Sequence, residues 1–100
     1  MYQYELFIPS NFRDMIQAAQ TSFTIYYGGC TTYNAEGAWR DANNLPNYEN
    51  TTVIMALSET DDDAPIQSQA KFVADYCNQE KVLWTKKKAE VNYVRKSWFY

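Results

Sequence analysis

The sequence of 100 residues contains no histidine. This absence removes the commonest general base and the commonest metal ligand, and with them every His-activated Ser or Cys nucleophile. The two cysteines, Cys30 and Cys77, stand far apart and match no zinc spacing. We therefore expect reduced thiols, no metal site and no chemistry that activates water near neutral pH.

Long apolar runs are also missing. No stretch approaches the roughly 18 apolar residues of a membrane span, and the first residues lack the basic region and apolar run of a signal peptide. Basic residues are few as well, since the net charge is -3 and the pI about 4.8. This charge argues against sequence-independent binding of nucleic acid, which depends on Lys and Arg. The sequence thus predicts a cytoplasmic protein with neither a membrane nor a nucleic-acid partner.

Aromatic residues are abundant, with nine Tyr, five Phe and three Trp. A chain of this length forms one domain, residues 1–100, and its 46% of hydrophobic residues can build a core. Seventeen aromatic side chains are more than such a core needs. We expect some of them to line a pocket or a subunit contact.

Hydrophobic periodicity predicts the order β-α-β-β-α-β-β. The expected strands cover residues 2–8, 23–41 (bent, or split in two), 51–59, 81–84 and 89–94, and the expected helices run from about 12 to 21 and from about 60 to 77, with a loop at 42–50. Two helices on one face of an antiparallel sheet give an α+β sandwich of the ferredoxin-like type, with an extra strand at its C-terminal end. The apolar residues 98–100 are expected to pack on the chain or to meet a partner.

Three stretches in this order resemble one known family. They are "GAWRDA" at 37–42, "ENTTVIMAL" at 49–57, and "CNQEKVLW" at 77–84 followed by "AEVNYV" at 89–94. They resemble the phage-encoded enzymes that cleave S-adenosylmethionine (SAM), formerly called SAM hydrolases and now understood as SAM lyases. In that family a Gly-x-Tyr-Arg-Glu-Ala-like stretch precedes a Glu-led strand, and a helix ending in a Gln-acid pair precedes a Val-Leu strand. The resemblance covers about residues 28–95.

This resemblance implies a ferredoxin-like homo-oligomer, commonly a trimer, with active sites between neighbouring subunits and no cofactor. It implies an intramolecular reaction, in which the methionine carboxylate of SAM attacks its own γ-carbon and yields methylthioadenosine and homoserine lactone. Because the sulfonium is already an activated leaving group, neither histidine nor metal is required. In a phage, destroying the methyl donor in the host cytoplasm counters SAM-dependent restriction.

Two polar residues carry the family's functional positions. Glu49 matches the essential carboxylate, which implies contact with the ribose hydroxyls or an electrostatic role near the sulfonium. Its structural alternative is a solvated Glu at the end of a loop. Gln79 matches an amide expected to hydrogen-bond the substrate, and its alternative is capping of a helix C-terminus.

Trp39 occupies the place of a functional tyrosine, which is the main departure from the family. An indole stacks and donates one hydrogen bond but has no phenol oxygen. We expect Tyr33 or Tyr48 to supply that oxygen if the chain cleaves SAM.

Arg40 is expected to help Trp39 wall the pocket, or else to pair with Asp41 at a strand end. Gly28 and Gly29 are expected to mark a bulge, or a close backbone approach to a ligand carboxylate. Two other functions stay open. One is a non-catalytic phage protein that binds a nucleotide-type ligand or antagonises a host defence protein, and small phage and bacterial proteins with Gly-x-Trp-Arg-Asp also resemble this chain. The other is an interaction protein whose aromatic C-terminus docks on a partner.

Overall fold

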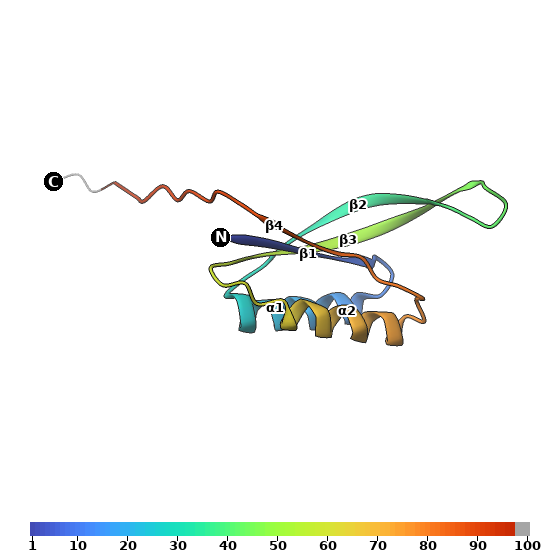
Figure 1. Cartoon of the computed structure of the whole chain (residues 1–100), viewed down its shortest axis with the longest axis horizontal. Coiled ribbons are helices and arrows are strands. Elements are labelled where there is room, and N and C mark those ends of the chain that lie inside the picture. Colours follow the sequence, from blue (N-terminus) through green and yellow to red (C-terminus); the bar gives the residue numbers. More distant parts are fainter. Residues whose placement is uncertain (98–100) are drawn as a thin grey trace.

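The computed structural model describes residues 1–97 and shows a four-stranded antiparallel sheet with two helices on one face (Figure 1). The elements are β1 (Tyr2–Pro9), α1 (Arg13–Tyr27), β2 (Thr31–Arg40), β3 (Pro46–Ser58), α2 (Ala64–Tyr76) and β4 (Trp84–Lys88). The strand order is β2-β3-β1-β4. The predicted α+β fold of ferredoxin-like type is therefore confirmed. The apolar residues 98–100 lie outside the described residues.

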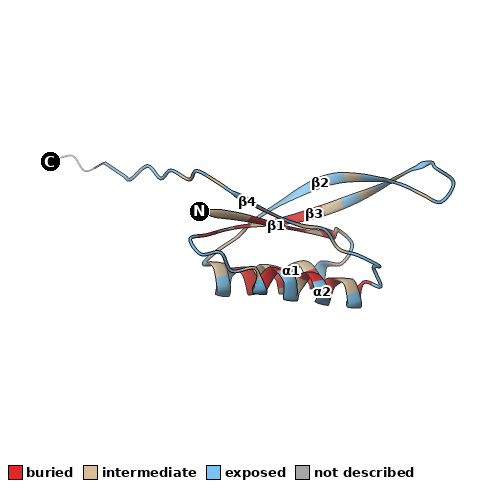
Figure 2. Ribbon diagram, in the orientation of Figure 1, coloured by how far each residue is buried: buried red, intermediate tan, exposed pale blue. Residues whose placement is uncertain are grey.

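The core lies between the sheet and the two helices (Figure 2). Alternation along β1 buries Tyr4, Leu6 and Ile8 completely, because successive strand residues face opposite sides of a sheet. The helices cover them with stripes at helical spacing, which are Met15, Ala19 and Phe23 from α1 and Ile66, Ala70 and Val73 from α2. Each fully buried large side chain contributes about 1.5–3 kcal/mol, so this layer holds the sheet in place.

Helix α1 runs to Tyr27, beyond the expected end near Thr21. The extension is stabilised by packing, since Phe23 is fully buried and Tyr27 stacks on Tyr4 with ring centroids 5.0 Å apart. Gly28 then ends the helix in the left-handed conformation, at φ +89°, and its N–H donates to the carbonyl of Thr24. The expected β-bulge at Gly28 and Gly29 is therefore wrong, because Gly28 forms the C-cap of α1 and Gly29 connects it to β2.

The other boundaries differ at the two ends of the sheet. The expected loop at 42–50 is shorter, because β3 already begins at Pro46. The strand expected at 81–84 starts only at Trp84 and continues to Lys88 along the edge of β1. The strand expected at 89–94 is absent from the described chain. Its partner would have been β1, but β1 begins at Tyr2, which already pairs with Lys88.

The described chain is elongated, with principal extents of 66 × 24 × 24 Å. Its radius of gyration is 15.9 Å, whereas a compact domain of this length has about 13 Å. Two extensions cause the difference: the β2–β3 hairpin at one end and residues 89–97 at the other (Figure 1). Neither helix is long and apolar enough to cross a bilayer.

Candidate functional site

The β2–β3 hairpin carries five of the eight candidate residues, and its turn is fixed by Asp41. One carboxylate oxygen of Asp41 accepts hydrogen bonds from the backbone N–H groups of Asn43 and Leu45, at 2.8 and 2.9 Å, and the other accepts from the Asn47 side chain at 2.9 Å. These bonds hold the pKa of Asp41 below its ordinary value. Asp41 therefore builds the turn and makes no ion pair with Arg40.

Glu49 and Trp39 lie on the outer face of the sheet, the face turned away from the helices. Glu49 pairs with Gly37 and Trp39 pairs with Asn47, so the two are diagonal neighbours, about 7–8 Å apart at their backbones. Glu49 is partly buried, whereas Trp39 is 51% exposed. Among the described residues, Glu49 has neither an ion pair nor a side-chain hydrogen bond. An indole face beside an unpaired carboxylate suits an organic cation.

Because Gly37 has no side chain, the space beside Glu49 on the outer face stays open. A Cβ at position 37 would lie 3.3 Å from the Thr51 hydroxyl and 3.8 Å from the Glu49 carbonyl. The first distance is tighter than ordinary van der Waals contact, and any larger side chain would extend over the outer face beside the carboxylate. The glycine of "GAWRD" thus leaves the space opposite Glu49 open.

Arg40 and Tyr48 lie on the other face of the same hairpin. Their register partners are Pro46 and Ala38, one residue out of step with Glu49 and Trp39, and alternation along a strand places them opposite. Tyr48 is 68% exposed. In one chain, therefore, Arg40 does not wall a pocket with Trp39, and Tyr48 does not bring its phenol oxygen to Glu49.

Tyr33 shares the outer face but serves another contact. It lies four residues from Gly37 along β2, about 13 Å away. Its hydroxyl donates a hydrogen bond to the Glu5 carboxylate, which raises the pKa of the Tyr33 phenol. Because Glu5 belongs to β1, the side chain reaches across β3, over the fully buried Val53 with which Tyr33 is paired. This phenol oxygen is therefore engaged away from Trp39.

The remaining candidates are at other places in the fold. Gly28 and Gly29 precede β2 at the end opposite the hairpin turn, where they help to line a cavity of about 220 Å³. Gln79 is exposed just beyond α2, and its backbone N–H donates to the carbonyl of Ala74 at 2.9 Å. Since α2 packs mainly on α1, β1 and β4, Gln79 lies on the side of the sheet away from β2. One chain thus brings together Glu49, Gly37 and Trp39 but not the whole predicted set.

A second cavity, of about 630 Å³, opens between the first turn of α1 and the base of the hairpin. It is polar, with Ser10, Arg13, Asn34, Glu36 and Asn50 among its lining residues. Ser10 and Asn34 are hydrogen-bonded to the Thr52 hydroxyl, at 2.8 and 3.5 Å. None of the candidate residues lines it, so it gives no support to the predicted site.

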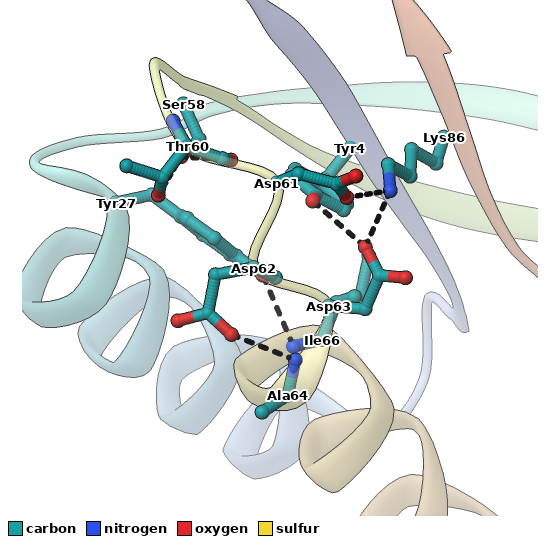
Figure 3. Close-up of polar contacts among 10 residues, drawn as sticks. All are labelled: Tyr4, Tyr27, Ser58, Thr60, Asp61, Asp62, Asp63, Ala64, Ile66 and Lys86. Carbon is teal, nitrogen blue, oxygen red and sulfur yellow. Dashed lines mark hydrogen bonds and ion pairs between the residues drawn. The ribbon is translucent and has the colours of Figure 1, made fainter.

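A separate polar cluster ties β4 to the loop before α2 (Figure 3). The ammonium of Lys86 pairs with Asp61 and, at 2.9 Å, with Asp63. The Tyr4 hydroxyl donates to Asp63 at 2.8 Å, and the Tyr27 hydroxyl donates to the Asp62 carbonyl at 2.9 Å. The aspartate run at 61–63 is therefore an anchor for β4 as well as the start of a helix.

The titration of this cluster follows its contacts. Hydrogen bonds from Lys86 and from Tyr4 hold the pKa of the Asp63 carboxyl below its ordinary value. Hydrogen bonds to Asp61 and Asp63 raise the pKa of Lys86. Burial, followed by the bond to Asp63, raises the pKa of Tyr4, and burial raises that of Tyr27 to about 12. All of these groups keep their ordinary charge at neutral pH, so the cluster is a structural lock.

Two solved structures resemble this fold. One is a phage SAM lyase in complex with S-methyl-5′-thioadenosine, with a TM-score of 0.59 and 16% identity over 87% of this chain and 80% of that chain. The other is a crystal structure of a DUF3240 family protein from Shewanella baltica OS155, with a TM-score of 0.52 and 14% identity over 95% and 97%. No protein-family model matches the chain, and neither does any curated protein. At these identities, the likeness shows a shared fold.

Sequence reasoning missed two structural roles. "DANNLPN" at 41–47 holds an Asx-type turn, and the pattern of Asp followed by Asn and Pro is the available signal. The pairing of Lys86 with Asp61 and Asp63 had no local signal, because it joins segments far apart in the sequence. No group of three or more metal-binding side chains comes together within residues 1–97, and Cys30 and Cys77 are not bonded to each other.

Proposed function

We propose that this chain cleaves SAM into methylthioadenosine and homoserine lactone. One observation carries the proposal. The carboxylate of Glu49, which makes no ion pair within the described chain, lies beside the exposed indole of Trp39 on the outer face of the sheet, and the residue opposite Glu49 is Gly37. The fold supports it, since the structure of a phage SAM lyase in complex with S-methyl-5′-thioadenosine resembles this one with a TM-score of 0.59. The sequence motifs that resemble that family include these same three residues.

The reaction needs little from the protein. A carboxylate oxygen of the methionine moiety forms a bond to the γ-carbon, while the bond from that carbon to sulfur breaks and its electron pair stays on sulfur. The products are a neutral thioether and a lactone that keeps its ammonium group, so atoms and charge balance. Catalysis then consists of holding the substrate in a reactive conformer and stabilising the charges of its transition state. A chain without histidine can do both.

In this proposal Glu49 lies near the sulfonium or the ribose, and Trp39 packs against the adenosine or the onium group. The other predicted residues, including Gln79, Arg40 and Tyr48, would complete the site from a neighbouring copy, because one chain does not bring them to Glu49. A homo-oligomer, most simply a trimer, is therefore part of the proposal. In a phage-infected bacterium, such an enzyme would deplete the methyl donor of restriction systems.

The test is to incubate the purified protein with SAM and to measure methylthioadenosine and homoserine lactone by chromatography. Glu49→Gln should lower the rate by about 10²–10³-fold, the usual loss for one electrostatic contact in a transition state, and should leave the circular dichroism spectrum unchanged. Glu59→Gln is the matched control, because Glu59 is exposed just after β3, at the end of the sheet opposite the hairpin turn.

Absence of turnover in the wild type, or full activity of Glu49→Gln, would remove this mechanism. A wild type that does not cleave SAM but is stabilised against heat by adenosine-containing ligands would favour the non-catalytic binder.

A further inference from the structure

Residues 89–97 are called the C-terminal arm below. The first six of them, 89–94, have the sequence pattern of a strand but belong to no sheet within residues 1–97. Ala89, Val91 and Tyr93 alternate with polar or exposed positions, which is typical of a strand. In the described chain the arm's one backbone hydrogen bond to the sheet is from Ala89 N–H to the Met1 carbonyl, at 2.9 Å. Beyond that point the arm leads away from the sheet (Figure 1), although Tyr93 still borders the cavity of about 220 Å³ beside Gly28 and Thr31.

The arm exposes apolar side chains that a folded monomer would normally cover. Val94 is 99% exposed and Tyr93 is 75% exposed. Within its own chain the arm cannot add to β1, because both sides of β1 are occupied, by β3 and by β4, down to Tyr2. A strand-like segment that has not joined the sheet of its own chain can add to a free sheet edge of another chain.

The sheet has two free edges that could receive such a strand, and charge distinguishes them. Edge strand β4 carries Lys87 and Lys88, which would repel the basic end of the arm at Arg95 and Lys96. Edge strand β2 carries Glu36 and, before Arg40, no basic residue. Over the whole chain, five of the nine basic residues lie at or after Lys86, whereas eleven of the twelve acidic residues precede Trp84.

We propose that the C-terminal arm of one copy adds as a strand to the free edge of β2 in a second copy. The 10 residues of β2 are long enough for the arm, and its outer backbone groups have no partner within residues 1–97. The contact is heterologous, since the arm and β2 are different surfaces. Repetition of such a contact closes into a ring when the rotation between successive copies completes a circle, and otherwise continues as an open filament. This assembly does not rest on the proposed reaction and is measured independently of SAM turnover.

The test uses sedimentation velocity on the full-length chain with substitutions in the arm. Asn92→Pro and Tyr93→Pro are compared with Asn92→Ala and Tyr93→Phe. Neighbouring strand residues point their N–H groups in opposite directions, so one of the two prolines must remove an inter-chain hydrogen bond. Because the arm forms no part of the sheet of its own chain, both proline variants should still unfold cooperatively on heating, and the circular dichroism spectrum should lose only the strand signal of the released arm.

We expect the wild type and both controls to sediment as a closed oligomer and at least one proline variant to sediment as a monomer. Hydrogen exchange should show β2 amides that are protected in the wild type and exchange freely in that variant. A monomeric wild type, or proline variants that both keep the wild-type mass, would overturn the proposal. Protection that changes at β4 and not at β2 would overturn the assignment of the edge.

Discussion

Replacing Tyr4 by Phe tests whether the lock around Lys86 stabilises the fold through its charged hydrogen bond. Tyr4 is fully buried, and its hydroxyl donates to Asp63 at 2.8 Å. Removing a hydrogen bond to a charged group costs about 1.5–3 kcal/mol. Asp63 is partly exposed and keeps Lys86, so water can replace part of the lost bond. We therefore expect a loss near the lower limit, about 1.5 kcal/mol, or roughly 6–12 °C in the melting temperature.

The loss should depend on pH. Hydrogen bonds depress the pKa of Asp63 below the 3.8 of the free side chain, so its ionised form stabilises the folded state. That stabilisation is fully present above about pH 5 and is lost as the pH falls below 3.8 through the depressed value. The difference between wild type and Tyr4→Phe should therefore be largest at pH 7 and should shrink by pH 3.

Urea unfolding followed by circular dichroism measures both effects, at one fixed protein concentration because association shifts apparent stability. Tyr2→Phe is the matched control. Its ring lies under the same Lys86 ammonium, at 5.0 Å, but its hydroxyl makes no hydrogen bond within the described chain. A Tyr4→Phe variant within 0.5 kcal/mol of the wild type at pH 7, or a loss that is equal at pH 7 and pH 3, would refute the reasoning.

Two further predictions concern the ends of β2. Gly28→Ala places a side chain at φ +89° and should lower the free energy of unfolding by about 1–2 kcal/mol, as measured by thermal unfolding. Gly29→Ala is a poorer probe, because φ +159° is nearly extended. An unchanged melting temperature of Gly28→Ala would contradict the C-cap assignment. Asp41→Ala should accelerate hydrogen exchange of the Asn43 and Leu45 amides. Asp41→Asn, which keeps an acceptor oxygen, should accelerate their exchange less than Asp41→Ala does. Equal exchange in the wild type and in Asp41→Ala would show that the carboxylate does not hold the turn.

The architecture could be predicted because its signals are local and mutually consistent. Alternation in "YQYELFI" defines β1, and the spacing of Ile66, Ala70 and Val73 defines the buried face of α2. Both patterns arise from side chains that must reach one core. The order of the elements then leaves few arrangements other than two helices on one face of an antiparallel sheet.

The predicted boundaries of the elements were wrong where packing overrides the local preference for a strand. Residues 23–27 are rich in β-branched and aromatic types, which favour strands, yet they are helical because Phe23 and Tyr27 reach the core from α1. The prediction of a strand at 89–94 was wrong for a different reason. The strand pattern of this segment is real, but the chain offers it no neighbour, and no single-chain signal in the sequence reports that.

The same distinction explains why the candidate site was only partly predicted. Motif spacing identified Glu49 and Trp39, and the register of β2 with β3 places them together. Motif spacing says nothing about which face a residue occupies, so it grouped Arg40 and Tyr48 with them, although these point to the other side of the hairpin. Successive residues of a strand alternate between the two faces of the sheet. This alternation, counted along β2 and β3 once their register is known, separates Glu49 and Trp39 from Arg40 and Tyr48.

The hairpin carries candidate residues on both of its faces, and this has a consequence for the proposed assembly. Because the hairpin projects beyond the helices, both of its faces are accessible to other copies (Figure 2). In a closed ring, one face of each hairpin can meet the copy before it and the other face the copy after it. Glu49 and Trp39 would then belong to one site while Arg40 and Tyr48 belong to the next. The division of the candidate residues between the two faces is thus what we expect if each proposed site forms between two copies of a ring.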